Sequence, residues 1–231
     1  MTHSNNPVEN PTTRVRIDFV SDISCPWCVI GLKSLEHALD NLDGQVQADI
    51  HFQPFELNPQ MPAQGQDSAE HIREKYGSTP EQIAANRENI RARGEALGFV
   101  FDMAKRSRVY NTFDAHRLLH WAGLEGRQAQ LKHALFGAYF TDGEDIGSHE
   151  VLIRLAGKVG LSMLRAREIL SSDSYAADVR KQERFYQGNG IHAVPAVILN
   201  ERHLISGGQP PQVFEAALLQ IAGRESDQPT A

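Results

Sequence analysis

The stretch Ser24-Cys25-Pro26-Trp27-Cys28 holds both of the cysteines present in this chain of 231 residues. Two cysteines three positions apart suit two chemistries: a dithiol that cycles to a disulfide, or half of a zinc site with four ligands. Buried cysteines without a reaction are the third, plainer reading. The residues on either side of the pair favour the dithiol.

The flanking sequence predicts a strand that runs directly into a helix. Val15, Ile17 and Phe19 alternate with charged residues, which is typical of a strand with one buried face. Pro26 then falls in the first turn of the predicted helix, where its missing N–H has no cost. Apolar residues beyond it recur at steps of three and four, as on an amphipathic helix: Cys28, Leu32, Leu35, Leu39 and Leu42.

The two sulfurs are therefore expected to differ. The N-terminus of a helix stabilises an anion because its N–H groups are unpaired, and the thiolate is the reactive form of cysteine. We expect Cys25 to be the exposed nucleophile at the start of the helix. Cys28 begins the apolar side of the helix and is expected to be the buried resolving thiol.

A zinc site would need two further ligands. His116 and His120 stand four positions apart on a predicted helix, but the segment between them lacks the glutamate of a metalloprotease helix. The chain has no second cysteine pair. We therefore expect no metal at the cysteines, and we interpret His116-Arg117 as a helix surface or a structural pair.

Composition excludes several classes of partner. The chain is 41% hydrophobic and long enough to bury a full core, while its net charge of -6 argues against nucleic acids and acidic membranes. No apolar run reaches the length of a membrane span. Residues 1–13 lack the basic and then apolar pattern of a secretory signal, so we expect a cytoplasmic protein whose dithiol is kept reduced.

The rest of the chain changes pattern twice. Residues 46–57 predict a second strand, which Asn58-Pro59 ends. Residues 68–172 read as almost all helix, with a capping box at Thr79-Pro80-Glu81-Gln82. Beyond residue 195 two short strands flank Asn200-Glu201-Arg202, and a final amphipathic helix follows.

This order, βαβ, a helical block and then ββα, predicts an α/β protein in which two distant segments complete one sheet. We expect residues 14–64 and 173–223 to form that domain. Residues 65–172 form an inserted helical subdomain, and 1–13 and 224–231 are expected to be flexible tails.

The motifs together resemble a known superfamily. Cys25-Pro26-Trp27-Cys28 after a strand, a helical insertion, and Ala193-Val194-Pro195-Ala196 before a closing ββα unit resemble the thioredoxin superfamily, and within it the FrnE-type branch of the DsbA-like oxidoreductases. Gly208 stands where that family often has alanine, and Ala196 where a bulkier residue is common. The matching segments follow the family's order along nearly the whole chain: 21–28 with Gly31, 55–59, 111–112, 115–118, 135–136, 138–140 and 206–209.

The resemblance implies a thioredoxin fold with a large all-helical insertion. It also implies that Val194-Pro195 is a cis peptide opposite Cys25, although only about 5–6% of bonds before proline are cis. Val194 would then offer its backbone N–H and C=O to an extended substrate. The other residues expected to bind substrate are Pro26, Trp27, Asn58, Gly207, Gly208 and Gln209.

The sequence thus predicts a thiol–disulfide oxidoreductase whose Cys25 and Cys28 reduce, form or isomerise disulfides. We expect no resident cofactor, with glutathione as a candidate co-substrate. The expected partners are disulfides of proteins or small thiols, and the protein is expected to be a monomer or a homodimer. The alternative is a glutathione-dependent isomerase or transferase, as in the 2-hydroxychromene-2-carboxylate isomerases and kappa-class glutathione transferases, which typically carry serine where Cys25 stands. A third class is a redox sensor without enzymatic activity.

Overall fold

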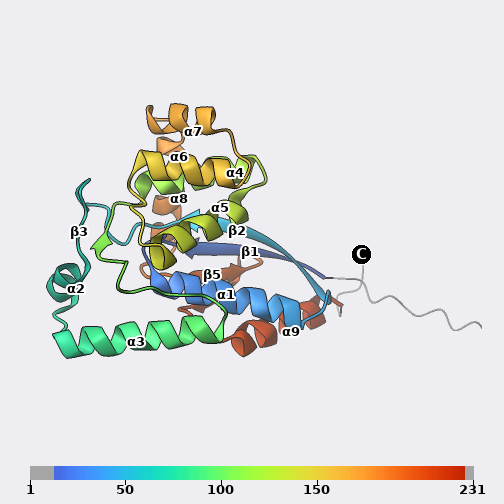
Figure 1. The fold of residues 1–231 in the computed structure, drawn as a ribbon. Helices are drawn as coiled ribbons and strands as arrows, with labels where there is room; N and C mark the ends of the chain where they lie inside the picture. The colour runs from blue at the N-terminus through green and yellow to red at the C-terminus, as the bar shows by residue number, and fades with distance from the viewer. Residues whose placement is uncertain (1–12, 227–231) are drawn as a thin grey trace, which may run out of the picture.

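The computed structural model describes residues 13–226, and a four-stranded sheet lies at its centre. β1 (Thr13–Ser21) pairs in parallel with β2 (Val46–Pro54) and antiparallel with β5 (Ala196–Leu199), which pairs antiparallel with β6 (His203–Ser206). The spatial order is β2-β1-β5-β6 (Figure 1). Strands from the two ends of the chain therefore complete one sheet, as the βαβ and ββα patterns predict.

Helices cover both faces of the sheet. Figure 1 shows α1 (Pro26–Asn41) and α9 (Pro211–Ser226) on one face, where they contact each other. The other face is covered by α4 (Phe113–Leu124), α5 (Gln128–Phe136) and α8 (Ala176–Gly188), all of which contact β2. Within residues 13–226, no helix combines the length and the apolar character needed to cross a bilayer.

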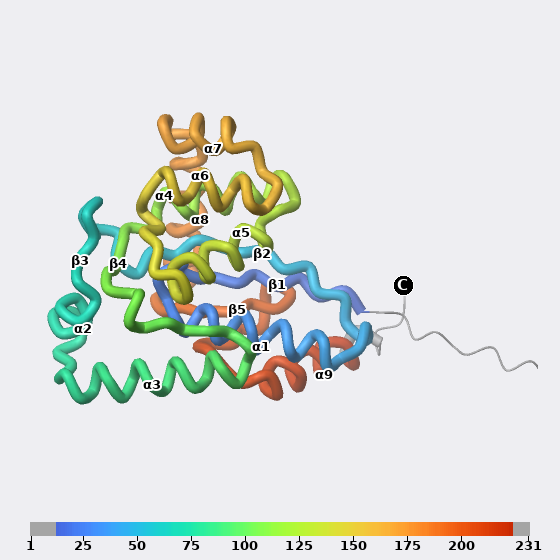
Figure 2. The backbone as a smooth tube through the Cα atoms, in the orientation of Figure 1, coloured from blue at the N-terminus to red at the C-terminus, as the bar shows by residue number. Residues whose placement is uncertain are grey.

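The remaining elements complete the helical block. Figure 2 shows α2 and α3 beside the β3–β4 pair at one side of the molecule. The prediction of an all-helical insertion did not include this pair, because its two strands are two residues each and are joined only in space. The bounds are β3 (Gln66–Asp67), α2 (Ser68–Tyr76), α3 (Pro80–Ala96), β4 (Arg108–Val109), η1 (Gly137–Thr141), α6 (His149–Lys158) and α7 (Met163–Leu170).

The sequence signal for the start of α3 is present in the structure. The capping box is confirmed, since Thr79 accepts from the N–H of Gln82 at 3.3 Å and the Gln82 side chain accepts from the N–H of Thr79 at 2.9 Å. The helix α4 includes Gly123 and ends at Leu124, and the chain then turns at Gly126 with φ of 67°.

The predicted tails differ from the structure at their inner ends. Thr13 is the first residue of β1, and α9 continues to Ser226, so neither position belongs to a tail. The rest of the predicted tails, residues 1–12 and 227–231, lies outside the described residues.

One hydrophobic core joins the sheet to the helical block. Side chains from β1 and α1 belong to the same buried cluster as side chains from α4, α5 and α6. Phe19 of β1 contacts Phe52 of β2 edge to face, with ring centroids 5.8 Å apart. Burial of this continuous apolar surface is what holds the inserted helices on the sheet.

A charged cluster fastens α8 to the end of β2. Arg180 of α8 pairs with Glu56, which is 6% exposed, and with Glu183 at 2.8 Å. Burial and the neighbouring Glu183 charge raise the pKa of Glu56 to about 7, although Arg180 acts in the opposite direction.

This cluster predicts a pH-dependent stability. Because the folded state raises the pKa of Glu56, it holds that proton more tightly than the unfolded chain does. The stabilising contribution is complete below the ordinary carboxyl pKa and is lost as the pH rises through about 7. We expect the free energy of unfolding to fall less with pH in Glu56→Gln than in the parent protein between about pH 5 and 8. Chemical denaturation at several pH values measures this, and equal slopes would contradict it.

Close packing at Gly94 of α3 gives a second stability prediction. A Cβ atom at this position would lie 2.3 Å from Cδ2 of Phe101 and 2.8 Å from the backbone oxygen of Phe99. We expect Gly94→Ala to lower the free energy of unfolding by about 1–3 kcal/mol through overpacking. Gly188→Ala is the matched control, since nothing lies within 4 Å of its added Cβ. Denaturation curves that coincide for the two variants would refute the prediction.

Candidate active site

The two cysteines lie at the start of α1, shortly after the end of β1. Cys25 is the N-cap residue of α1, Pro26 is the first residue of the helix, and the N–H of Cys28 donates to the oxygen of Cys25 at 3.1 Å. Both cysteines are free thiols. The helix start that Pro26 predicts is therefore confirmed.

The expected difference in burial is present, but Cys25 is not exposed. Cys25 is 4% exposed and Cys28 is fully buried. The expectation of an exposed Cys25 is wrong because the carbonyl of Val194 and the walls of a cleft lie around its sulfur. Burial, followed by the hydrogen bond to Cys25, raises the pKa of the Cys28 thiol well above its usual range.

A proline loop crosses the start of α1. The Val194-Pro195 peptide bond is cis, as the resemblance implied, and the Cys25 thiol donates to the carbonyl of Val194 with Sγ and O 3.7 Å apart. A Cβ atom on Gly31 would lie 3.0 Å from Cγ of Pro195, so this helical glycine allows the loop to approach.

Three of the predicted substrate residues do not line the cleft, and one of them, Gly207, supports the proline loop. Gly207, with φ of 81°, donates its N–H to the oxygen of Pro195 at 2.8 Å. A Cβ atom on Gly208 would lie 3.0 Å from the backbone oxygen of Trp27. The side chain of Gln209 donates to the oxygen of Ser206 at 2.8 Å, within its own turn.

A cleft of about 690 Å³ opens beside Cys25. It brings together five of the predicted site residues, while Cys28, which is fully buried, and Pro195 do not line it. The facing wall consists of α2, α3 and the segment that leads into β4. The predicted residues that line the cleft are Cys25, Pro26, Trp27, Asn58 and Val194.

The facing wall carries positive charge. Lys75, Arg87 and Arg106 line the cleft, against the single carboxylate of Glu56 among its described lining residues. Lys75 donates to Oδ1 of Asn58 at 2.7 Å. Arg106 lies 5.0 Å from the centre of the Tyr139 ring, and its buried Nε has no hydrogen-bond partner among the described residues.

Sequence reasoning missed this wall. The many arginines of α3 favour a solvated face, and Arg91 does pair there with two glutamates of its own helix. Arg87 is different, because it lines the cleft and donates to Oγ of Ser68 at 3.0 Å. Arg93 places its guanidinium 5.1 Å from the ring centre of Trp27. The interpretation as a solvated face is therefore wrong for Arg87.

A buried aspartate below the cysteines was also missed. Asp22 accepts from the N–H of Ser24 at 3.1 Å, from the Ser24 hydroxyl at 3.0 Å and from the N–H of Leu57 at 2.7 Å. Burial favours its protonated form, but the neighbouring His116 imidazole and these N–H groups lower the pKa of Asp22 overall. The Asp-x-Ser spacing is typical of an aspartate whose side chain accepts hydrogen bonds within its own turn. This spacing is the sequence signal that could have identified Asp22.

His116 and Arg117 separate in role. The Nε2 atom of His116 lies 3.7 Å from Oδ1 of Asp22 and 3.2 Å from the backbone oxygen of Phe55. Arg117 is structural, as interpreted, since it donates to the carbonyls of Ile169, Ser172 and Ser174. Across residues 13–226, no three His, Cys, Asp or Glu side chains are grouped to hold a metal ion.

Comparison with known proteins places this geometry in a family. The model of the DSBA-like thioredoxin domain matches residues 16–219. The crystal structure of the probable DsbA oxidoreductase SCO1869 from Streptomyces coelicolor has 33% identity and a TM-score of 0.86, over 94% of this chain and 93% of that one. The protein YwbO of Bacillus subtilis (strain 168) is 28% identical over 206 residues, which are 88% of this chain and 96% of YwbO.

A more distant structure shares the fold. The cytosolic disulfide reductase DsbM from Pseudomonas aeruginosa, solved with GSH, has 19% identity and a TM-score of 0.62, over 90% of this chain and 99% of that one. The match of the family model covers most of the chain and includes both cysteines and the proline loop. The chain therefore belongs to the family of DSBA-like thioredoxin domains.

Proposed function

We propose that this protein is a thiol–disulfide oxidoreductase in which Cys25 is the nucleophile and Cys28 the resolving thiol. The observation that carries the proposal is the position of Cys25 at the start of α1, with its sulfur on a cleft and 3.7 Å from the Val194 carbonyl of the proline loop. Cys28 follows within the first turn of the same helix, and its N–H donates to the backbone oxygen of Cys25 at 3.1 Å.

The reaction proceeds in two exchanges. The Cys25 thiolate attacks one sulfur of a substrate disulfide, so that a Cys25–substrate disulfide forms and the other substrate sulfur leaves as a thiolate. Cys28 then loses its proton and attacks Cys25, which releases the second thiolate and leaves a Cys25–Cys28 disulfide. Two thiols of a second substrate return the pair to the dithiol. Run in reverse, the same steps oxidise a dithiol substrate.

The volume and the charge of the cleft favour one class of substrate. Its volume lies within the range of about 300–1,000 Å³ that small-molecule sites occupy. Lys75, Arg87 and Arg106 face the space beside Cys25, and cations of this kind pair with carboxylates. We therefore favour disulfides that carry carboxylates, of which glutathione disulfide is an example. The alternative of a glutathione-dependent isomerase would show saturable glutathione binding without any disulfide reduction.

Substitution of each cysteine tests the roles. We expect Cys25→Ser to abolish the reduction of insulin disulfides, because the nucleophile is lost. Cys28→Ser should accumulate a covalent Cys25–substrate disulfide, which mass spectrometry of the intact protein detects. Activity that persists in Cys25→Ser, or a Cys28→Ser protein that traps no adduct, would contradict the proposal.

Charge in the cleft gives a separate prediction. We expect Arg87→Gln to raise KM for glutathione disulfide about tenfold, the effect of about 1.4 kcal/mol from one charge-assisted hydrogen bond. KM for the uncharged 2-hydroxyethyl disulfide should stay the same. Arg91→Gln is the control on the same helix, since Arg91 pairs with Glu88 and Glu95 on an exposed face. If Arg87→Gln changes KM equally for the two disulfides, or if Arg91→Gln has the same effect as Arg87→Gln, the cleft does not select substrates by charge.

A further inference from the structure

The cleft beside Cys25 has one lightly packed wall. Residues 72–86, which we call the α2–α3 corner, join the end of α2 to the start of α3 at the margin of the molecule (Figure 2). Within this corner Ile83 is the only buried residue, and Tyr76 is 63% exposed although it lines the cleft. Segments with so few buried contacts open at a low cost in free energy. Apolar packing therefore contributes little to holding the α2–α3 corner against the cleft.

The two ends of α2 are held in different ways. At the N-terminal end, the N–H of Ser68 donates to the oxygen of Ser107 at 2.8 Å, and β3, directly before it, pairs with β4. At the C-terminal end, Lys75 donates to the backbone oxygen of Leu57 at 2.8 Å and to Oδ1 of Asn58 at 2.7 Å. Both acceptors follow β2 and line the cleft. Among the described residues, Lys75 is the one hydrogen-bond donor that ties the α2–α3 corner to this part of the cleft.

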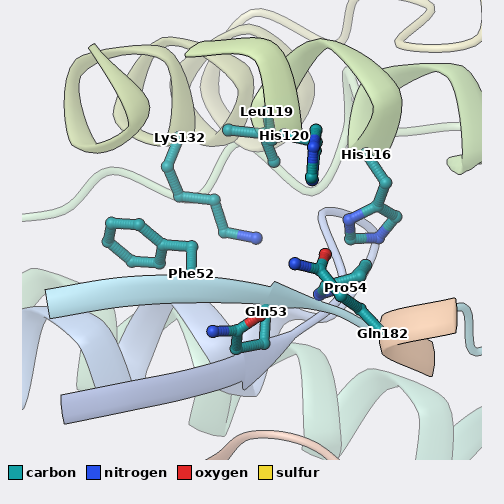
Figure 3. Close-up of a pocket in the computed structure, with 8 residues that line it drawn as sticks. All are labelled: Phe52, Gln53, Pro54, His116, Leu119, His120, Lys132 and Gln182. Atoms are coloured by element: carbon teal, nitrogen blue, oxygen red, sulfur yellow. The ribbon is translucent and has the colours of Figure 1, made fainter. Parts of the chain in front are cut away.

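The cavity on the α4 side of β2 is too small to admit a disulfide. Figure 3 shows the buried Lys132 of α5 pointing into this cavity between α4 and the end of β2, which His116 and His120 also line. Its volume of about 10 Å³ is roughly that needed for a single water molecule, and Cys25 is not among its described lining residues. Of these two spaces, only the cleft can therefore bring a disulfide to Cys25, past the α2–α3 corner.

We propose that Lys75 is a latch whose hydrogen bonds to Leu57 and Asn58 hold the α2–α3 corner closed beside Cys25 and so limit the size of the disulfide that can react. The role in substrate choice rests on the proposed thiol–disulfide exchange, whereas the latch itself concerns access to the sulfur. In the closed form Cys25 is 4% exposed, and only narrow molecules reach it. When the two hydrogen bonds break, the corner swings about the anchored end of α2 and bulkier groups reach the sulfur.

Alkylation of Cys25 tests the latch without any turnover. In a Cys28→Ser background, two uncharged reagents, the small iodoacetamide and the bulky N-(1-pyrenyl)maleimide, react with a single thiol, and intact mass reports the rate. We expect Lys75→Met to raise the maleimide rate about tenfold, which corresponds to the loss of about 1.4 kcal/mol of hydrogen bonding, and to leave the iodoacetamide rate within about threefold. An unchanged maleimide rate would overturn the proposal. Equal acceleration of both reagents would also overturn it, because it would show a more reactive sulfur and not a wider opening.

Three further variants separate the latch from a general effect of charge. Lys75→Arg keeps the donors and should keep the maleimide rate close to that of the parent. Arg73→Met removes a cation of the same helix that does not line the cleft, and it should change neither rate. Asn58→Ala removes one acceptor and no charge, so it should raise the maleimide rate about threefold and add nothing further to Lys75→Met. Additive effects, no restoration by arginine, or an equal effect of Arg73→Met would overturn the proposal. If Lys75→Met does not fold, Asn58→Ala gives the same comparison of reagents.

Hydrogen exchange then locates the motion. We expect Lys75→Met to raise the exchange rate of the amides in residues 72–86 about tenfold, while the amides of α1 keep their protection. Equal acceleration in α1 would show that the whole fold is destabilised, and it would overturn the proposal. A parent protein whose Cys25 is alkylated as expected but which reduces no disulfide would instead refute the proposed function, and the latch would still stand.

Discussion

The pairing of β5 with β1 is the constraint on which the candidate site depends. The register sets Val20 opposite Ala196 and Phe19 opposite Val197, directly after the proline loop. It therefore delivers the Val194 carbonyl to the sulfur of Cys25, although the two residues are 169 positions apart in the chain. A slip of one residue would turn the buried faces of the strands outward, so packing of the core also fixes the site.

The fold divides the chemistry between two sources. The start of α1 and the proline loop supply the sulfurs and the proline, while the three cations of the cleft wall come from the helical block: Lys75, Arg87 and Arg106. The larger of the two hydrophobic clusters among the described residues joins the block to the sheet, so packing holds these charges in place. Under the proposed function, changes in the block would therefore alter which substrates bind, while the sheet and the cysteines stay the same.

The local parts of this structure could be predicted from sequence because their causes are local. Pro26 marks the start of α1, and Thr79 with Gln82 marks the start of α3. The cis bond before Pro195 followed from the resemblance alone, since local preference favours trans. The βαβ and ββα patterns predicted that strands from both ends of the chain share one sheet, and they do.

The buried charges could not be predicted in that way. Lys132 lies between Leu131 and Leu135 on a short helix, and its burial depends on aromatic side chains such as Phe52 of β2. The helix α3 has only a few apolar residues. Its sequence therefore does not show which side of the helix faces the cleft, as Arg87 does, and which side faces solvent, as Arg91 does. Residues 127–140 read as one helix, but the chain passes into the wider turn of η1, where the N–H of Asp142 reaches the oxygen of Gly137. The burial of Lys132 and the position of Arg87 on the cleft are decided by groups that are distant in the chain.

The depth of Cys25 has a consequence for the choice of partner. Cys25 is 4% exposed, and its sulfur lines the cleft. Under the proposed function, a disulfide has to enter the cleft before this sulfur can attack it. The site would therefore select substrates by shape, because a small disulfide or one on a flexible segment fits such a cleft better than one inside a rigid domain.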